Sequence, residues 1–281
     1  MLRKPATIAC ILAPICFATA TGALELEYVS HLPLYFPEIS LTEPSGLAVA
    51  VDGSGFWIVS DETRTVFKMN PNGEIRPFLD RDDRMRDLEG VAEDAERSRL
   101  LMVSERKNTV IAASLSAPHH LDAVNVRKLP GPENLTKALK DKDDGLEGIA
   151  VNTDTGSIFV LKERKPRLLV EIAPSLDRIL AVSKLDDILP EDEDVSGLTV
   201  DTARNGFWIV SDVGKSVHFL PFDDEPVATL DLFWRDGERK RKLDNVEGAA
   251  LSPDGRYLFV LTDDDKKSRI VRYGIIDENA D

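Results

Sequence analysis

The sequence predicts an all-β protein, a β-propeller of five four-stranded blades, on the strength of two observations. A short motif recurs five times: a small or acidic residue, then Gly, then an aliphatic residue and an apolar run. A carboxylate also stands fifteen residues after each motif glycine. The glycines are Gly46, Gly90, Gly148, Gly197 and Gly248, and the carboxylates are Asp61, Glu105, Glu163, Asp212 and Asp263. Repeated units that stack around one core form a single domain.

Each unit shows the pattern of four antiparallel strands. The apolar run after the glycine is the first strand, and a turn such as Asp52-Gly53-Ser54-Gly55 joins it to a second strand rich in aromatic and β-branched residues. A third strand follows in every unit. Fourth strands are expected at residues 75–79, 124–129, 179–183 and 227–232. Intervals of 44, 58, 49 and 51 residues between the glycines are typical of propeller blades.

The fifth unit lacks a clear fourth strand, whereas residues 24–29 alternate like a strand that has no partner nearby. Pairing this N-terminal strand with the third strand of the last unit would close the ring and leave no exposed sheet edge. Six blades is the alternative, with residues 115–144 as the place for another blade. The prolines there favour a loop with a short helix. The acidic run 191–194 and the basic run 239–242 are expected to be solvated loops.

The first 20 residues have the pattern of a secretory signal peptide, with a charged start, an apolar stretch and small residues. Cleavage is expected after Ala20 or Ala23, which would leave residues 24–281 as one propeller domain in the periplasm or outside the cell. An uncleaved segment that anchors a periplasm-facing propeller to the inner membrane is the alternative.

Composition narrows the classes of partner. The 281 residues carry a formal net charge of −15, which argues against a nucleic-acid partner because nucleic-acid binding needs a basic face. The same charge is compatible with cation binding. Both cysteines, Cys10 and Cys16, lie in the signal segment, so cleavage would remove disulfide and thiol chemistry. We expect a monomer with a small-molecule or protein ligand that the sequence does not identify.

Hairpin geometry predicts where the acidic residues gather. The start of the first strand lies beside the end of the second, and the first strand lines the central channel, so every unit contributes acids to one mouth. The predicted acids are Asp61, Glu105, Glu163, Asp212 and Asp263, together with Glu89, Glu147 and Glu247 just before their glycines. Slightly upstream come Glu43, Asp87, Asp144, Asp194 and Asp244.

So many carboxylates need compensation, because two of them about 5 Å apart repel by roughly 3 kcal/mol at an effective dielectric constant of about 20. A hard divalent cation such as Ca²⁺ would provide it, since the available ligands are oxygens. The alternative is that each acid caps its own blade by accepting backbone N–H bonds from a neighbouring loop. Arg106, Lys162 and Arg164 are the candidate ligand-binding cations at this mouth.

Several motifs in order resemble the SdiA-regulated (YjiK-like) family of exported bacterial β-propeller proteins. They are Glu43-Pro44-Ser45-Gly46-Leu47, Val59-Ser60-Asp61-Glu62, Asp87-Leu88-Glu89-Gly90-Val91, Gly145-Leu146-Glu147-Gly148-Ile149 and Lys162-Glu163-Arg164-Lys165-Pro166. The resemblance implies an exported or membrane-associated propeller with a calcium site that includes Glu89, Glu147 and Glu163. The match is looser around Gly197 and Gly248.

Two functions follow from these features. One is a periplasmic binding or sensing propeller that holds a divalent cation at its acidic mouth. The other is a calcium-dependent phosphoesterase of phytase-like type, in which bound metal activates water and neutralises phosphate. The motifs of serine hydrolases, zinc proteases and P-loop enzymes do not occur in the chain.

Overall fold

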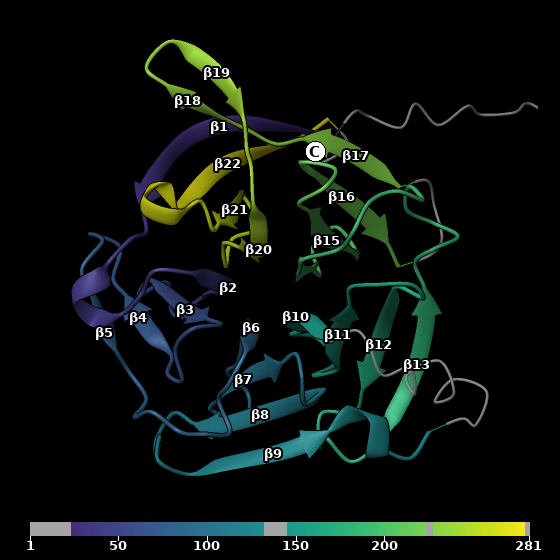
Figure 1. Cartoon of the computed structure of the whole chain (residues 1–281). Helices are drawn as coiled ribbons and strands as arrows, with labels where there is room; N and C mark the ends of the chain where they lie inside the picture. Colours follow the sequence, from purple (N-terminus) through teal and green to yellow (C-terminus); the bar gives the residue numbers. More distant parts are fainter. Residues whose placement is uncertain (1–23, 132–144, 223–226, 279–281) are drawn as a thin grey trace, which may run out of the picture.

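A computed structural model describes residues 24–131, 145–222 and 227–278. This part of the chain forms five four-stranded antiparallel sheets, one two-stranded hairpin and three short 3-10 turns. The sheets stand around a central axis as the blades of a propeller (Figure 1), so the predicted all-β fold with five blades is confirmed. The expected signal peptide and its cleavage at Ala20 or Ala23 lie outside the described residues, as does Asp144.

The blades follow one another along the chain. Blade 1 comprises β2 (Pro44–Val49), β3 (Phe56–Ser60), β4 (Phe67–Met69) and β5 (Ile75–Pro77). Blade 2 comprises β6 (Leu88–Asp94), β7 (Arg99–Ser104), β8 (Thr109–Ser114) and β9 (Leu121–Asn125). Blade 3 comprises β10 (Leu146–Val151), β11 (Ile158–Lys162), β12 (Leu168–Ile172) and β13 (Ile179–Lys184). Blade 4 comprises β14 (Gly197–Asp201), β15 (Gly206–Ser211), β16 (Ser216–Pro221) and β17 (Ala228–Asp231).

Blade 5 combines both ends of the described chain. Its strands are β20 (Val246–Leu251), β21 (Tyr257–Thr262), β22 (Arg269–Asp277) and the N-terminal β1 (Leu24–Pro33). β1 pairs antiparallel with β22 from Leu24 opposite Asp277 to Pro33 opposite Arg269. The predicted closure by the N-terminal strand is therefore confirmed, and β1 covers the edge of β22 that the last unit would otherwise expose.

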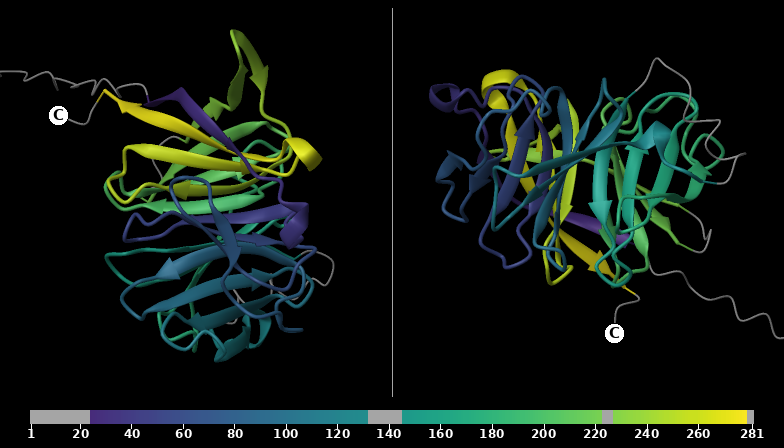
Figure 2. Two further views of the ribbon diagram at one scale, coloured as in Figure 1. Left: turned by 90° about the vertical axis from the view of Figure 1, so that its left-hand side faces the viewer. Right: turned by 90° about the horizontal axis from the view of Figure 1, so that it is seen from below.

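Two local predictions need correction. The fourth strand of blade 2 is β9, at Leu121–Asn125, and residues 126–128 form the 3-10 turn η2 instead of continuing it. The turn is favoured because it buries Val126 and Leu129 in the core that blades 2 and 3 share. The basic run 239–242 is a strand, β19 (Arg239–Lys242), which pairs with β18 (Phe233–Asp236) around Gly237. This hairpin stands out from the ring (Figure 2), and all four residues of β19 are exposed, as expected.

The register explains the spacing of the motif. Each motif glycine pairs with the residue thirteen positions later, from Gly46 opposite Val59 to Gly248 opposite Leu261. The carboxylate two residues further on therefore lies just past the second strand, beside the start of the first. A Cβ on Gly46 would lie 2.8 Å from the carbonyl oxygen of Glu89, so glycine is required where the inner strands converge.

The core lies in the seams between blades. Alternate side chains of each blade face opposite neighbours, and the buried apolar residues gather in five clusters. Phe56 of blade 1 meets Phe259 of blade 5 edge to face at 5.0 Å between ring centroids. Packing of this kind fixes the blades as rigid walls around the channel.

Candidate metal centre

The channel is narrowest at the motif glycines. Five inner strands, β2, β6, β10, β14 and β20, bring these glycines together with Glu89, Glu147 and Glu247 around a cavity of only about 10 Å³. Toward the opposite face the channel widens to a chamber of about 300 Å³ whose lining includes Leu47 and Ile149. The constriction therefore separates an acidic mouth from a more apolar chamber.

Glu89, Glu147 and Glu247 form a half-buried inner ring at this constriction. Burial, and next the charges of surrounding carboxylates, raise the pKa of Glu89 to about 10, of Glu147 to about 9 and of Glu247 to about 8. At neutral pH without a cation, the three side chains hold their protons. Raised pKa values are thus one of the ways in which this mouth relieves its charge.

Serines take the place of these glutamates in the other two blades. The Ser45 hydroxyl of blade 1 donates to the Leu88 carbonyl of blade 2. The Ser196 hydroxyl of blade 4 donates to the Val246 carbonyl of blade 5 at 2.6 Å. Each serine therefore links its blade to the next one, a structural role that the motif alone did not indicate.

The outer carboxylates have different surroundings. Asp212 accepts the backbone N–H of Val246 in the next blade at 3.0 Å, which is the capping role weighed as the alternative to metal binding. Asp263 accepts the Ser268 hydroxyl at 3.3 Å. Glu163 pairs with Arg164 at 3.1 Å. The charge of Glu105 acts on both Glu89 and Glu147, which places it at the same mouth.

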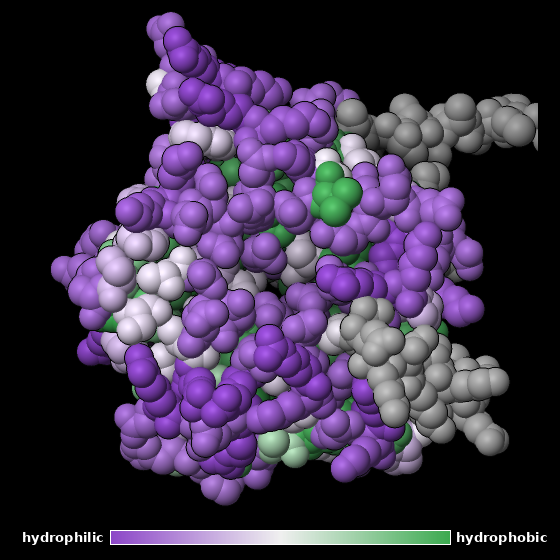
Figure 3. All heavy atoms as spheres, in the orientation of Figure 1, coloured by the Kyte–Doolittle hydropathy of each residue, from purple (hydrophilic) through white to green (hydrophobic). Residues whose placement is uncertain are grey.

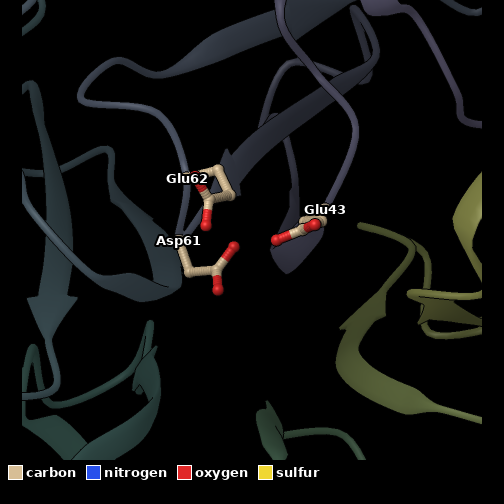
Figure 4. A group of neighbouring side chains, drawn as sticks. All are labelled: Glu43, Asp61 and Glu62. Atoms are coloured by element: carbon tan, nitrogen blue, oxygen red, sulfur yellow. The ribbon is translucent and has the colours of Figure 1, made fainter.

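Blade 1 brings three acids together. Carboxylate oxygens of Glu43, Asp61 and Glu62 lie within 4.8 Å of one another, and in the described residues no other trio of His, Cys, Asp or Glu meets this criterion. Figure 4 shows the three side chains converging from the start of β2 and the loop after β3. Burial, offset in part by a backbone hydrogen bond from Glu62, raises the pKa of Asp61.

Two polar atoms at this end of blade 1 are unsatisfied. Asp61 Oδ1 and the Ser60 hydroxyl are both shielded from solvent, and neither has a hydrogen-bond partner among the described residues. Ser60 itself is fully buried. Unpaired buried polar atoms are costly, so an oxygen-seeking cation at this cluster would satisfy the carboxylate that the protein leaves unpaired.

The donor set fits a hard divalent cation. Carboxylate oxygens are the ligands that Ca²⁺ prefers, and it takes about six to eight of them at about 2.3–2.6 Å. Glu43, Asp61 and Glu62 offer up to six carboxylate oxygens. Beside Glu62 lies a polar hollow of about 920 Å³, whose lining includes Arg64 and Arg81. A cation at the cluster would therefore face a space wide enough for a small ligand.

The three predicted basic residues lie near the mouth but in different settings. Lys162 is 1% exposed, and its ammonium donates to the carbonyls of residues 164 and 166, at 2.7 and 3.4 Å. Arg164 is paired with Glu163. Arg106 lies 3.7 Å from Asp87. Lys162 thus serves the loop that follows β11, while the two arginines neutralise neighbouring acids.

Sequence reasoning placed Asp61 and Glu43 at the mouth but missed Glu62. The repeat drew attention to one acid per blade at a fixed offset, and Glu62 lies one residue beyond it. The adjacent pair Asp61-Glu62 differs from Asp212-Val213 of blade 4, but blade 5 has Asp263-Asp264 at the matching positions, so the sequence did not single out blade 1. The face that carries the mouth is mostly hydrophilic (Figure 3).

The chain belongs to the SdiA-regulated family, whose model matches residues 26–263. Solved structures share its fold. Glutaminyl cyclase from Myxococcus xanthus matches with a TM-score of 0.58 and 13% identity over 90% of this chain and 98% of its own. A PQQ-bound aldose sugar dehydrogenase from Streptomyces coelicolor matches with a TM-score of 0.52 and 12% identity over 91% and 99%.

A chain of a nidogen/laminin complex matches with a TM-score of 0.54 and 14% identity, over 85% of this chain and 84% of that one. At these identities the likeness concerns the fold alone, because propellers of one shape carry unrelated sites. In the described residues, no helix is long and apolar enough to cross a membrane.

Proposed function

We propose that this protein is an exported β-propeller binding protein that holds a divalent cation, calcium by its donor chemistry, at the blade 1 side of its acidic mouth. The observation that carries the proposal is the convergence of Glu43, Asp61 and Glu62 together with the unpaired Asp61 Oδ1. Three ionised side chains at this spacing repel one another, and a bound cation would relieve that repulsion and keep all three charged.

The bound cation would serve to capture a ligand. Water or a ligand oxygen completes the coordination of a calcium ion that protein groups hold on one side. The polar hollow beside Glu62 offers the space, and its lining contains Arg64 and Arg81 as well as Asp82 and Asp83. Arg64 is ion-paired with Asp83, which leaves Arg81 as the candidate partner of an anionic ligand. We therefore propose a small, oxygen-rich ligand that bridges the cation and Arg81, bound by a monomeric propeller.

The contacts of the three basic residues predicted at the mouth favour a binding function over phosphoester hydrolysis. A phosphoesterase needs cations that contact phosphate beside the metal. Lys162 is buried against backbone carbonyls, and Arg106 and Arg164 lie against carboxylates. These three predicted residues therefore do not form the phosphate clamp that this second function requires.

The test is calorimetric titration of the purified, EDTA-treated protein with CaCl₂. We expect one saturable site in the wild type and a loss of affinity on the order of 100-fold in Glu62→Gln, because one of three ligating carboxylates is removed. Asp177→Asn, at an exposed turn of blade 3, is the matched control and should bind as the wild type does. Absence of binding heat in the wild type, or equal affinities in all three proteins, would overturn the proposal.

The signal-peptide pattern in residues 1–20 supports a periplasmic or secreted location. Fractionation of bacterial cells that express the chain with a C-terminal tag tests it. The tag should appear in the periplasm or medium at the mass of the shortened chain. Recovery in the membrane fraction at full mass would instead indicate the uncleaved anchor.

A further inference from the structure

A second hollow lies far from the acidic mouth, in the seam between blade 5 and blade 1. It has a volume of about 550 Å³, and its lining includes the turn residues Gly53 and Pro253 at the opposite end of the blades. Apolar side chains contribute to its wall, among them Val49, Phe56 and Phe259. A volume of this size, with mainly apolar walls and a few polar groups, is typical of small-molecule sites.

Arg272 is the polar group that distinguishes this hollow. Its guanidinium carbon lies 3.5 Å from the ring centroid of Tyr257, and both residues line the hollow. Its Nε is shielded from solvent and has no hydrogen-bond partner in the described part of the chain. The other arginine of the lining, Arg256, donates to Asp254 at 2.7 Å. The hollow therefore contains a cation whose buried donor lacks an acceptor.

The seam between blades 1 and 2 carries a cation at the matching strand position and has a carboxylate beside it. Lys68 pairs across its blade with Trp57, as Arg272 does with Phe259. The Lys68 ammonium lies 3.7 Å from the Trp57 ring centroid. Glu93 of the next blade accepts the Trp57 indole N–H at 2.7 Å, so a carboxylate stands in that seam beside the cation and the ring.

The matching carboxylate is missing from the seam between blades 5 and 1. Glu93 comes three residues after its motif glycine, and the residue three after Gly46 is Val49. Val49 is shorter and uncharged, and it lines the hollow that holds Arg272. Where blade 2 supplies an anion, blade 1 therefore leaves an apolar space.

We propose that this hollow binds a small organic anion with an apolar body. The carboxylate or sulfonate of the ligand accepts charge-assisted hydrogen bonds from Arg272, and the apolar body packs against Phe56 and Phe259. Charge complementarity selects an anion, and the apolar wall selects against small inorganic ions. This site is separate from the proposed cation site and does not depend on it.

Two fluorescent probes that share one ring system but differ in charge test this proposal. 8-Anilino-1-naphthalenesulfonate carries a sulfonate, whereas N-phenyl-1-naphthylamine has the same rings and no charge. Titration of the purified protein should give one saturable site for each, with the sulfonate at least tenfold tighter. Arg272→Met should abolish that preference while the neutral probe still binds, which also shows that the hollow is intact.

Two further variants sharpen the result. Arg272→Lys keeps the charge and should retain the preference for the sulfonate. Arg76→Met removes an exposed arginine of β5 and should leave both affinities unchanged. Equal affinity of the wild type for the two probes, a preference that survives Arg272→Met, a preference lost in Arg272→Lys, or an equal loss in Arg76→Met would overturn the proposal.

Discussion

Blades 4 and 1 present two versions of the same mouth. In blade 4, Asp194 accepts the Ser211 hydroxyl at 2.7 Å and the backbone N–H of Val213 at 3.0 Å, so the loop after β15 is closed by its own acid. In blade 1 the corresponding residues are Glu43, Ser60 and Glu62, and the Ser60 hydroxyl has no partner in the described residues.

This difference between blades 4 and 1 shows how one copy of a repeated unit can gain a candidate metal site. In blade 4, Asp194 accepts hydrogen bonds from its own loop, and Asp212 accepts one from blade 5. Blade 1 keeps an acid at each position but has the longer Glu43 and adds Glu62, so that three carboxylates meet and one oxygen remains unpaired in the described residues. An acid whose oxygens accept protein hydrogen bonds therefore has a structural role, whereas an acid with an unpaired oxygen is a candidate ligand of a cation.

The largest expected effect is the difference between substituting Asp61 and substituting Asp212, the acids fifteen residues after the motif glycine in blades 1 and 4. Asp61→Asn should lower calcium affinity on the order of 100-fold, because it removes the unpaired charged ligand. Asp212→Asn should leave the affinity within about threefold, because its amide oxygen can still accept the Val246 N–H and it lies outside the cluster. Calorimetry with both variants checks this, and the opposite ranking would refute the assignment of blade 1.

The pH dependence of stability tests the difference between blades 2, 3 and 5, which carry a glutamate in the inner ring, and blades 1 and 4, which carry serine at that position. The pKa values of Glu89, Glu147 and Glu247, about 10, 9 and 8, lie above the ordinary 4.5. At pH values between 4.5 and the raised pKa of each glutamate, the folded protein binds more protons than the unfolded chain. The stability that these three glutamates contribute is thus full below pH 4.5 and is lost as pH rises through about 8 to 10.

Thermal unfolding in EDTA should show a midpoint at pH 9 that is lower than at pH 5 by at least about 10 °C. Glu147→Gln should reduce this difference, because the amide removes one titrating group from the ring. A midpoint that rises with pH, or one that Glu147→Gln leaves unchanged in slope, would contradict the assignment of raised pKa values.

A matched pair of serines tests the hydrogen bonding. Ser211→Ala should destabilise the protein by about 1–3 kcal/mol, because the hydroxyl donates to Asp194 and accepts the Gly214 N–H. Ser60→Ala should not destabilise the protein in EDTA and should stabilise it by up to about 1 kcal/mol, since no bond is lost and a buried, unpaired hydroxyl is removed. Urea unfolding of both variants measures the difference, and equal costs would mean that Ser60 is bonded after all.

A further prediction concerns a variant in which the mouth of blade 1 is given the residues of blade 4. The double variant Glu43→Asp/Glu62→Val places the shorter acid and the apolar residue of blade 4 at the blade 1 mouth. We expect a gain of about 0.5–1 kcal/mol in EDTA, from relief of repulsion and a new cap, together with loss of calcium binding. Destabilisation with retained binding would show that the two mouths are not interchangeable.

Local patterns in the sequence were sufficient to predict the architecture. Motif glycines that pair with the residue thirteen positions later, turn signals between short strands and a spare N-terminal strand are local properties, and they led to five blades and to the closure of β1 on β22. Hairpin geometry also placed Asp61, Asp212 and their counterparts at one end of every blade. These features follow from backbone hydrogen bonds that form within a single blade.

Which acids come together at the mouth depends on the folded arrangement of the chain. Glu43 and Asp61 are eighteen residues apart, and their convergence with Glu62 depends on side-chain directions that spacing does not encode. The anchoring of Lys162 on loop carbonyls and the unpaired Nε of Arg272 likewise arise where loops and neighbouring blades come together. Repeats fix where backbones lie, whereas the partners of a polar side chain depend on residues from other parts of the fold.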